Sequence, residues 1–375
     1  MKKLLYIAPV IIDLEKLNGV SKKILNHYKI FNKYYNVEMI SYGPNCLYYF
    51  HDNIIDKIDL NKSNRRIKLY SYLNNQIAPK NNYDFVYIRY LLSDFLFLNV
   101  LRILNKRTHK IVIEIPTFPY KKELLKIEKG LIKFLVDFTS RPFLKFYVSR
   151  IITYSNDSVI FGIKTINTIN GIIYDDIIQS QKRLHPKTEI NLISVSMTIP
   201  CHGYDRIIEG LNEYYKCEGN INIFYHLVGN GEEIKKYEKL ITKYKLEKNV
   251  KLYGFVSGVE LNNIYNKADI AIDSLGIHRS GLIKESTLKS REYAAKGLPI
   301  ISANEVDFFT QEENKKYVFR VPSNESPVDM KKLIQFYLQI YSDNKFNIAD
   351  QIRNISRNKG DMNATLQGVV EYFNK

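Results

Sequence analysis

Short apolar runs alternate with helical patterns along the chain, and this alternation constrains the fold more than any other feature. The first series of apolar runs comprises Leu4–Pro9, Val37–Ser41, Phe85–Ile88, Ile111–Ile115 and Ile151–Tyr154. The second series comprises Ile190–Val195, Ile223–Val228, Val250–Tyr253, Ile270–Ser274 and Pro299–Ser302. Helical stretches such as Ser21–Tyr34 and Asp94–Asn105 lie between the runs. Because strands that alternate with helices form doubly wound parallel sheets, the sequence predicts two α/β domains.

The composition is that of a folded protein with an anionic partner. The chain has 375 residues, of which 45% are hydrophobic and 25% are charged, so it is long enough for two cores. Its 55 Lys and Arg against 39 Asp and Glu give a net charge of +16. Such an excess indicates a membrane surface, a nucleic acid or a phosphorylated substrate as partner. Cys46, Cys201 and Cys217 lack disulfide or zinc spacing, which suits a reducing cytoplasm.

The expected domain limits follow from the N-terminus, where the first strand series begins, and from the turn after its last strand. We interpret the apolar N-terminus as a buried strand rather than a signal peptide, because Pro9 interrupts it and no small-residue cleavage site follows. No apolar run reaches the ~18 residues of a spanning helix, so any membrane contact is expected to be peripheral. An Asn170-Gly171 turn precedes a charged stretch and is typical of a domain connection. We therefore expect domains at 1–168 and 169–359.

The segment Ser286–Ile301 predicts a helix, a glycine stop and a buried strand. Ser286 and Thr287 are good N-cap residues before the periodic run Leu288–Lys296. Gly297 suits a left-handed helix cap, and Pro299 prevents the helix from continuing. The free N–H groups at the start of such a helix form an anion site.

Charged side chains in this segment match the chemistry of a nucleotide-sugar. Lys289, Arg291 and Arg279 would add cations to the anion site, where a diphosphate could bind. Glu292 supplies a hydrogen-bond acceptor of the kind that a ribose diol needs. The alternative is an ordinary amphipathic helix with a glycine cap.

The segment resembles the donor-binding helix of GT-B glycosyltransferases, in particular the retaining family 4. Its matching residues are Glu292, Ala295, Gly297 and Pro299, whereas Lys284 stands where that family has its first Glu. The resemblance implies a GT-B fold, with two Rossmann-like domains that face a central cleft. It also implies that Glu292 holds the ribose and that a helix at about 360–375 crosses back onto the first domain.

The resemblance extends to other loops and assigns further donor contacts. The phosphate-binding Arg and Lys of the family fall on Met197 and His202, so His202, Arg279, Lys289 or Arg291 would have to replace them. The expected donor-binding residues are Gly19, His202, Gly229, Phe255, Val256, Arg279, Ser280, Gly281, Ser286, Thr287, Leu288, Lys289 and Glu292. The alternatives are a plain turn at Gly19, capped by Ser21, and a half-exposed loop histidine at His202.

The loop that follows Ile111–Ile115 is a candidate acceptor site. Pro116 and Pro119 favour a rigid, extended loop. We expect Glu114 or Thr117 to orient the acceptor hydroxyl and Tyr120 to contact the acceptor. Together with Lys289, which would neutralise the leaving diphosphate, Glu114 and Thr117 are the candidate catalytic residues. A purely structural loop is the alternative reading.

The stretch 121–150 is basic and amphipathic. Eight Lys and Arg against three Asp and Glu give residues 120–150 a net charge of +5. Apolar residues recur at helical spacing at Leu124, Ile127, Leu131, Leu135 and Phe138. Such a helix can lie in an anionic membrane interface, or it can pack its apolar stripe on the sheet.

These features together predict a retaining glycosyltransferase that needs no metal or other cofactor. It would move a sugar from a nucleotide-sugar, a UDP-sugar, to a glycan or lipid-linked acceptor in capsule, O-antigen or exopolysaccharide synthesis. It would work in the cytoplasm or at the inner face of the membrane. A protein glycosyltransferase, a GT-B epimerase and a nucleic-acid-binding protein are the alternatives. We expect no nucleic acid, because aromatic residues are not interleaved with the basic runs as a stacking platform requires.

Overall fold

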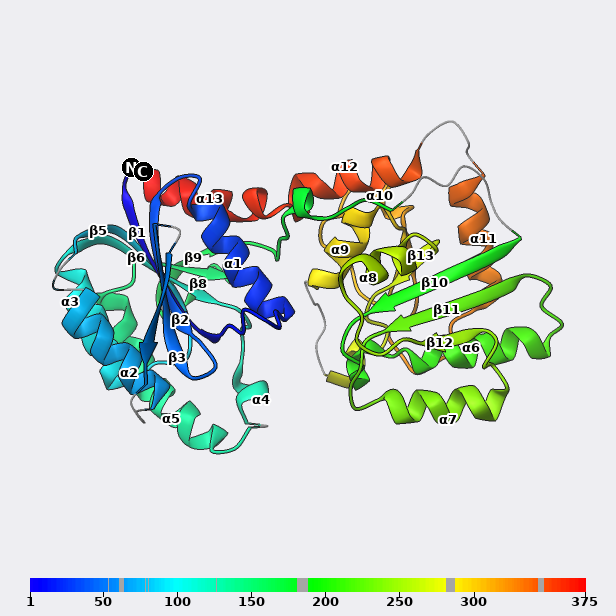
Figure 1. Ribbon diagram of the computed structural model, residues 1–375, viewed down its shortest axis with the longest axis horizontal. Helices are drawn as coiled ribbons and strands as arrows, with labels where there is room; N and C mark the ends of the chain where they lie inside the picture. The colour runs from blue at the N-terminus through cyan, green and yellow to red at the C-terminus, as the bar shows by residue number, and fades with distance from the viewer. Residues whose placement is uncertain are drawn as a thin grey trace. The chain divides into compact units, whose positions relative to one another are not determined.

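The computed structural model describes residues 1–375 apart from 53, 61–63, 78, 80, 126, 181–187, 281–286 and 343–346. The chain divides into two compact units (Figure 1). The N-terminal unit comprises Met1–Asn170 and Met362–Lys375, and the C-terminal unit comprises Gly171–Asp361. Each unit is an α/β domain and is described by itself.

A mixed sheet forms the centre of the N-terminal unit. Within the described residues its nine strands are ordered β4-β3-β2-β1-β5-β6-β7-β9-β8. They are β1 (Lys3–Ile11), β2 (Asn36–Tyr42), β3 (Cys46–His51), β4 (Ile54–Asp59), β5 (Tyr83–Arg89), β6 (Thr108–Ile115), β7 (Arg150–Thr153), β8 (Val159–Ile160) and β9 (Ile163–Asn167). The strands from β2 through β1, β5, β6 and β7 to β9 are parallel neighbours. All five strands expected from the sequence lie in this parallel part, whereas its last strand β9 and the antiparallel additions β3, β4 and β8 were not expected.

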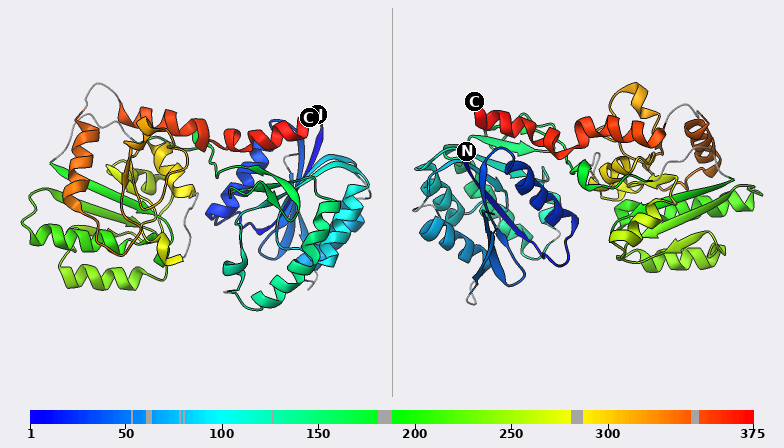
Figure 2. Two further views of the ribbon diagram at one scale, coloured as in Figure 1. Left: turned by 180° about the vertical axis from the view of Figure 1, so that it is seen from behind. Right: turned by 45° about the horizontal axis from the view of Figure 1, so that its top comes forward.

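Helices cover both faces of this sheet. They are α1 (Gly19–Phe31), α2 (Arg65–Tyr72), α3 (Phe95–Asn105), α4 (Lys121–Leu124), α5 (Gly130–Ser140) and α13 (Met362–Asn374), with a π turn η1 (Leu73–Ile77) and a 3₁₀ turn η2 (Arg141–Phe146). Asp94 caps α3 by accepting a hydrogen bond from the Phe97 N–H. The C-terminal helix α13 lies beside α1 (Figures 1 and 2). Its Phe373 ring stacks on Phe85 of β5 at 4.5 Å.

The C-terminal unit has a fully parallel sheet. Six strands, counted within the described residues, are ordered β12-β11-β10-β13-β14-β15. They are β10 (Glu189–Val195), β11 (Asn222–Val228), β12 (Val250–Leu252), β13 (Ile270–Ile272), β14 (Ile300–Ser302) and β15 (Val318–Arg320), of which β15 was not expected from the sequence. The strand order therefore reverses between β10 and β13. In such sheets ligands bind outside the carboxyl ends of the strands at the point of reversal.

Helices also cover both faces of the second sheet. They are α6 (Asp205–Lys216), α7 (Ile234–Tyr244), α8 (Gly258–Tyr265), α9 (Leu288–Lys296), α10 (Glu312–Lys315), α11 (Met330–Tyr341) and α12 (Ile348–Gly360), with 3₁₀ turns η3 (Tyr174–Asp176), η4 (Pro200–His202) and η5 (Ile277–Ser280). Figures 1 and 2 show α6 and α7 on one side of the strands and α9 and α12 on the other. The sheet is thus enclosed between two helical layers, whereas the ends of its strands are not covered by these layers.

Helix α9 forms where the sequence predicts it. Thr287 is the N-cap, and its hydroxyl accepts a hydrogen bond from the Ser290 N–H at 3.2 Å. Gly297 ends the helix with φ 81°, in the left-handed region. A Cβ at Gly297 would lie 2.5 Å from the Cβ of Ala349 in α12, so glycine is required here by both conformation and packing. Ser286, the other expected N-cap, lies outside the described residues.

Candidate functional site

Two backbone loops meet where the strand order of the second sheet reverses. One loop follows β10 and contains η4, and the other follows β13 and leads into η5. The Leu275 N–H donates to the His202 carbonyl at 2.9 Å, and the Gly276 N–H donates to the Cys201 carbonyl at 3.1 Å. Gly203 has φ 62°, and a Cβ there would lie 2.5 Å from the Gly276 nitrogen. The two loops therefore form a single wall at the carboxyl ends of β10 and β13.

A glycine turn after β11 supports this wall from the other side. A Cβ at Gly229 would lie only 1.8 Å from the Ser196 carbonyl oxygen. The Thr198 N–H donates to the Asn230 carbonyl at 3.0 Å. Gly229 therefore allows two loops to pack backbone against backbone, while its expected contact with the donor stays a prediction.

The N-terminus of α9 carries a cation beside the wall. The Lys289 ammonium lies 3.6 Å from Asp273 Oδ1, directly after β13, and 3.4 Å from the Tyr204 hydroxyl. The Thr287 hydroxyl donates to the same Asp273 oxygen at 3.1 Å. Lys289 thus lies at the start of a helix, where free N–H groups and the helix dipole also favour an anion. These groups can neutralise the charge of a bound diphosphate.

His202 is held in its neutral form. Its Nδ1 lies 2.5 Å from the Met197 carbonyl oxygen and 3.1 Å from the Ser196 hydroxyl. Burial and the nearby charge of Lys289 lower the pKa of His202 to about 3. His202 therefore cannot supply the positive charge that the family's Lys would supply. Met197, in the place of the family's Arg, is 68% exposed and uncharged.

The two arginines expected near the phosphates already have carboxylate partners. Arg279 binds both oxygens of Asp205 at 2.9 Å each and also binds Glu325. Arg291 is completely buried and donates to Asp307 at 2.7 Å and to the Thr287 carbonyl at 2.6 Å. The suggestion that Arg291 contacts the diphosphate is therefore corrected, because its guanidinium has no exposed surface.

The other expected donor contacts lie around the same end of the sheet. Glu292 is half-buried one turn after Lys289 and accepts a hydrogen bond from the Tyr265 hydroxyl at 3.2 Å. Phe255, in the loop after β12, is 84% exposed. Val256 and Leu288 are half-buried, and the Ser280 hydroxyl donates to the Ile277 carbonyl. Gly281 and Ser286 lie outside the described residues. The ribose and base contacts of these residues stay predictions.

In the N-terminal unit, Glu114 lies at the end of β6 in a buried network. Its Oε1 accepts hydrogen bonds from Lys23 at 3.1 Å, Arg89 at 2.9 Å and the Tyr154 hydroxyl at 2.7 Å. Burial alone would raise the pKa of Glu114, but the charges of Lys23 and Arg89 hold it well below its usual range. Because Glu114 is 0% exposed, it can affect an acceptor only through these partners.

Sequence reasoning missed Lys23, Arg89 and Tyr154. Lys23 is on α1, and Arg89 ends β5, the neighbour of β6 in the sheet. The signal available was a charged residue at the carboxyl end of each of two apolar runs. Arg89 follows the run Phe85–Ile88, and Glu114 is the last residue but one of the run Ile111–Ile115. Parallel strands bring such ends together.

The remaining expected residues of this unit lie on nearby loops. Thr117 is half-buried. The Tyr120 hydroxyl donates to Asp137 Oδ2 at 2.5 Å. Gly19 is exposed and begins α1, which is capped by Asn18 accepting from the Ser21 N–H at 2.9 Å. Asn18, not Ser21, is therefore the cap. Glu114 and Thr117 lie in one unit and Lys289 in the other.

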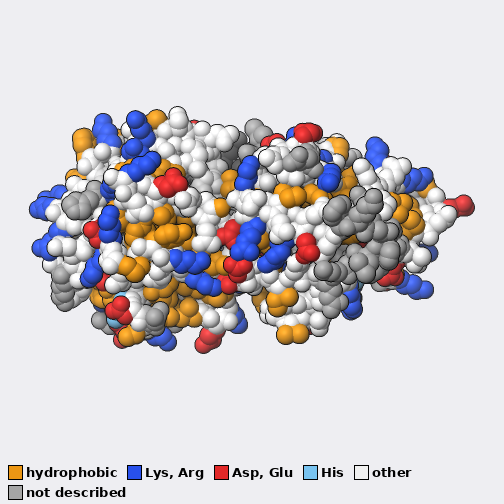
Figure 3. All heavy atoms as spheres, turned by 90° about the horizontal axis from the view of Figure 1, so that it is seen from above, with side chains coloured by type: hydrophobic (Ala, Val, Ile, Leu, Met, Phe, Trp, Pro, Cys, Tyr) orange, Lys and Arg blue, Asp and Glu red, His pale blue; other side chains and the backbone are white. Residues whose placement is uncertain are grey.

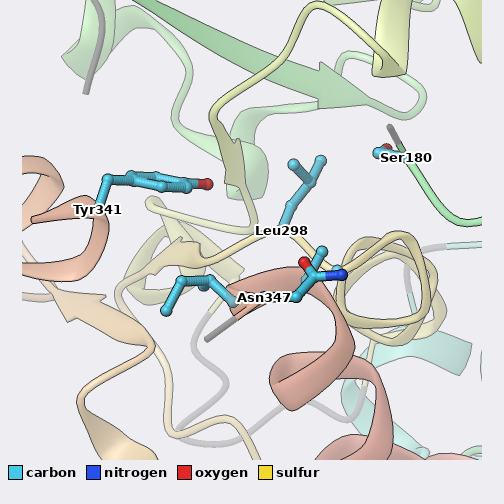
Figure 4. Close-up of a pocket in the computed structure, with 7 residues that line it drawn as sticks. Ser180, Leu298, Tyr341 and Asn347 are labelled. Atoms are coloured by element: carbon cyan, nitrogen blue, oxygen red, sulfur yellow. The ribbon is translucent and has the colours of Figure 1, made fainter. Parts of the chain in front are cut away.

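Other features of the described residues bear on the kind of site. No group of three or more His, Cys, Asp or Glu side chains there could hold a metal ion. In the same residues no helix is both long and apolar enough to cross a membrane. A cavity lined by Gly297, which ends α9, has a volume of only about 10 Å³. Ser180, Leu298, Tyr341 and Asn347 also line it (Figure 4). It has room for about one water molecule and not for a substrate.

Comparisons with known proteins agree with this geometry. Residues 175–357 match the sequence model of the family described as glycosyl transferases group 1. A search of curated proteins finds no match. A glycosyltransferase from Rickettsia africae is structurally similar with a TM-score of 0.63 at 15% identity, covering 99% of this chain and 97% of its own. HepE from Anabaena, solved with UDP, gives a TM-score of 0.62 at 14% identity over all of both chains. Sucrose-phosphate synthase from Thermosynechococcus elongatus gives a TM-score of 0.63 at 14% identity, covering 100% of this chain and 98% of its own.

The fold is therefore GT-B, and the protein is a glycosyltransferase. The match to the glycosyl transferases group 1 model lies within the C-terminal unit.

Proposed function

We propose that the protein transfers a sugar from a UDP-sugar to an acceptor hydroxyl with retention of anomeric configuration, as in family 4. The observation that carries the donor half is Lys289 at the start of α9, with Glu292 one turn later at the reversal of strand order. HepE, which shares the fold, has been solved with UDP and with UDP-glucose.

The reaction breaks the bond between the anomeric carbon and a diphosphate oxygen and forms a bond from that carbon to the acceptor oxygen. The proton of the acceptor hydroxyl passes to the departing diphosphate. Negative charge grows on the departing diphosphate. The N–H groups of α9 and the Lys289 ammonium are placed to stabilise that charge. Positioning and electrostatics carry this step, and we propose that no metal or other cofactor is needed.

We propose a lipid-linked glycan as the acceptor, in capsule, O-antigen or exopolysaccharide synthesis at the inner face of the cell membrane. One structural neighbour is WaaG, described as involved in lipopolysaccharide biosynthesis. We do not propose the alternative of nucleic-acid binding. On the one face that Figure 3 shows, the described Lys and Arg side chains lie among side chains of other types rather than in a stripe.

Nucleotide binding tests the donor assignment. UDP should raise the melting temperature of the protein more than GDP, ADP or CMP does, because a ligand that binds only the folded state stabilises it. Glu292→Ala should weaken UDP binding by at least about tenfold, since a charged hydrogen-bond acceptor is lost. The matched control is Glu238→Ala, an exposed carboxylate on α7. Equal UDP affinity in Glu292→Ala and wild type would show that the ribose assignment is wrong.

A further inference from the structure

Helix α5 is buried on its polar side and exposed on its apolar side. Its buried residues are Gly130, Asp137 and Ser140. Its exposed residues include five large apolar side chains, which are Leu131 (59% exposed), Ile132 (61%), Leu135 (52%), Val136 (39%) and Phe138 (53%). A surface helix normally turns its apolar stripe toward the core. Here the sequence periodicity is real, but the stripe faces outward.

Hydrogen bonds to Asp137 fix this orientation. Asp137 Oδ1 accepts from the Ser93 N–H at 2.7 Å and from the Tyr90 hydroxyl, and Oδ2 accepts from the Tyr120 hydroxyl at 2.5 Å. At the start of the helix, a Cβ on Gly130 would lie 1.8 Å from the Leu124 carbonyl oxygen. Rotation of α5 to bury its apolar side would break these bonds and leave the Tyr90 hydroxyl and the Ser93 N–H, both of buried residues, without their acceptor, which is costly.

Exposed apolar side chains continue in the segments before and after helix α5. We call the α5 surface the exposed apolar residues Leu125, Ile127, Leu131, Ile132, Leu135, Val136, Phe138, Phe143 and Phe146. They lie within one short stretch of the chain, and Phe143 and Phe146 belong to η2. Exposed apolar side chains gathered in this way mark an interaction site rather than ordinary solvent-facing surface.

Cations accompany the α5 surface. Lys121, Lys129, Lys133 and Lys145 are exposed, and Glu128 is the one exposed acid among the side chains described in 121–146. The Lys145 ammonium lies 5.3 Å from the centre of the Phe146 ring. The Arg141 guanidinium lies 4.8 Å from the centre of the Phe138 ring. Apolar side chains with cations beside them match an anionic bilayer interface, where acyl chains and negative headgroups lie at adjacent depths.

We propose that the α5 surface docks the protein on an anionic lipid bilayer. A second copy of the chain is the less suitable partner, because a symmetric contact would bring together two basic surfaces of a protein with net charge +16. The inference deepens the proposed function and rests on it for its biological meaning. Tyr120, an expected acceptor contact, is hydrogen-bonded to Asp137 of α5, so docking would place the acceptor loop next to the lipid surface.

Flotation of the full-length protein with lipid vesicles tests the proposal. Wild type should float with phosphatidylcholine vesicles that contain phosphatidylglycerol, and far less with phosphatidylcholine alone. Leu131→Ser, Leu135→Ser and Phe138→Ser combined should reduce binding by roughly a hundredfold, because buried apolar area sets the affinity of interfacial helices. The control is Ile67→Ser on α2, an exposed apolar residue (57%) of the same unit outside the α5 surface.

A second set of variants separates charge from apolar contact. Lys129→Gln, Lys133→Gln and Lys145→Gln combined should weaken binding to the anionic vesicles, by roughly fivefold for each lysine that reaches the headgroups. The matched control removes three exposed lysines elsewhere in the unit, Lys57→Gln, Lys106→Gln and Lys164→Gln. These assays need neither donor nor acceptor, so a failure of docking is distinct from a failure of UDP binding.

Three outcomes would overturn the proposal. The first is wild type that does not bind the anionic vesicles, and the second is equal binding by the α5 variants and their controls. The third is a wild-type dimer in sedimentation that the apolar variant converts to a monomer, since a second copy would then cover the α5 surface. Circular dichroism identical to that of wild type would confirm that the variants, whose changes are all at exposed positions, remain folded.

Discussion

The Lys23 ammonium donates a hydrogen bond to the side-chain oxygen of Asn170 at 2.7 Å, although 147 positions separate the two residues. The same ammonium binds Glu114 at 3.1 Å. Asn170 is the last residue of the N-terminal unit before the chain enters the C-terminal unit. The buried charge network at the end of β6 therefore also holds the point at which the chain leaves its first domain.

Removal of Lys23 should destabilise the N-terminal unit. Lys23→Met leaves the Glu114 carboxylate buried with Arg89 as its remaining cation, and breaking a buried ion pair of this kind costs about 3 kcal/mol. Urea denaturation followed by circular dichroism measures the change. Lys22→Met, one position earlier on α1 and exposed, is the control and should change the free energy of unfolding by less than about 0.5 kcal/mol. Equal effects of the two variants would contradict a stabilising role for the network.

Acidification should destabilise the protein through His27. Burial, and to a lesser degree the charge of Lys23, lowers the pKa of His27 to about 3. Because an unfolded histidine has a pKa of ~6.5, the unfolded state gains a proton as the pH falls below that value, and the folded state does not. Stability contributed by the neutral ring is therefore lost from about pH 6.5 downward, by about 2 kcal/mol at pH 5. Glu114 acts in a lower window, because its unfolded pKa of ~4.3 lies below pH 5.

His27→Phe should remove this part of the pH dependence. The His27 ring packs among Tyr6, Phe31 and Tyr87, and its Nδ1 has no hydrogen-bond partner among the described residues. Phenylalanine therefore fits the chemistry of the site. The difference in stability between pH 8 and pH 5 should be smaller in the variant by about 2 kcal/mol. A wild-type slope retained in His27→Phe would show that another group titrates.

Lys289 should matter more for catalysis than for binding of the intact donor. Lys289→Met removes the cation beside the N-terminus of α9, and loss of one such group at a developing charge typically lowers kcat by roughly a hundredfold. Steady-state kinetics with a donor identified by the nucleotide screen measures the effect. Lys248→Met, an exposed lysine of the same unit, should leave kcat unchanged. A Lys289 variant that raises only KM would indicate a binding role alone.

Substitution of Gly297 should show how much close packing at the end of α9 contributes to stability. In Gly297→Ala the alanine must adopt φ 81°, and its Cβ would lie 2.5 Å from the Cβ of Ala349. We therefore expect the free energy of unfolding to fall by about 3 kcal/mol, which is more than the ~1–2 kcal/mol that the left-handed conformation costs by itself. Gly258→Ala isolates that conformational part, because Gly258 has φ 62° with no atom near its Cβ position. Equal losses in the two variants would mean that Ala349 moves aside at little cost.

The sequence predicts α9 and the parallel strands well because their signals are local. Thr287, Gly297 and Pro299 limit the helix by capping and by backbone restriction. Strand β4 was missed because its side chains are almost all exposed, so it shows no apolar alternation. The Lys23–Glu114 pair joins positions 91 residues apart, and no local pattern reports such a contact.

Helix α5 shows a second limit of sequence reasoning. Its periodic apolar residues indicate an amphipathic helix, but periodicity does not say which side faces the protein. Asp137 decides this by binding Tyr90 and Tyr120, two partners that only the folded chain brings together. For the same reason the ion pairs that occupy Arg279 and Arg291 were not foreseen.

The position of α13 in the N-terminal unit has a consequence for biosynthesis. The stacking of Phe373 on Phe85 joins the last helix to the third parallel strand of the first domain. A ribosome must therefore make the whole C-terminal unit before the N-terminal unit can receive its final element. While the chain is growing, the surface of β5 and α1 that α13 will cover stays open, and chaperones have their longest opportunity to bind there.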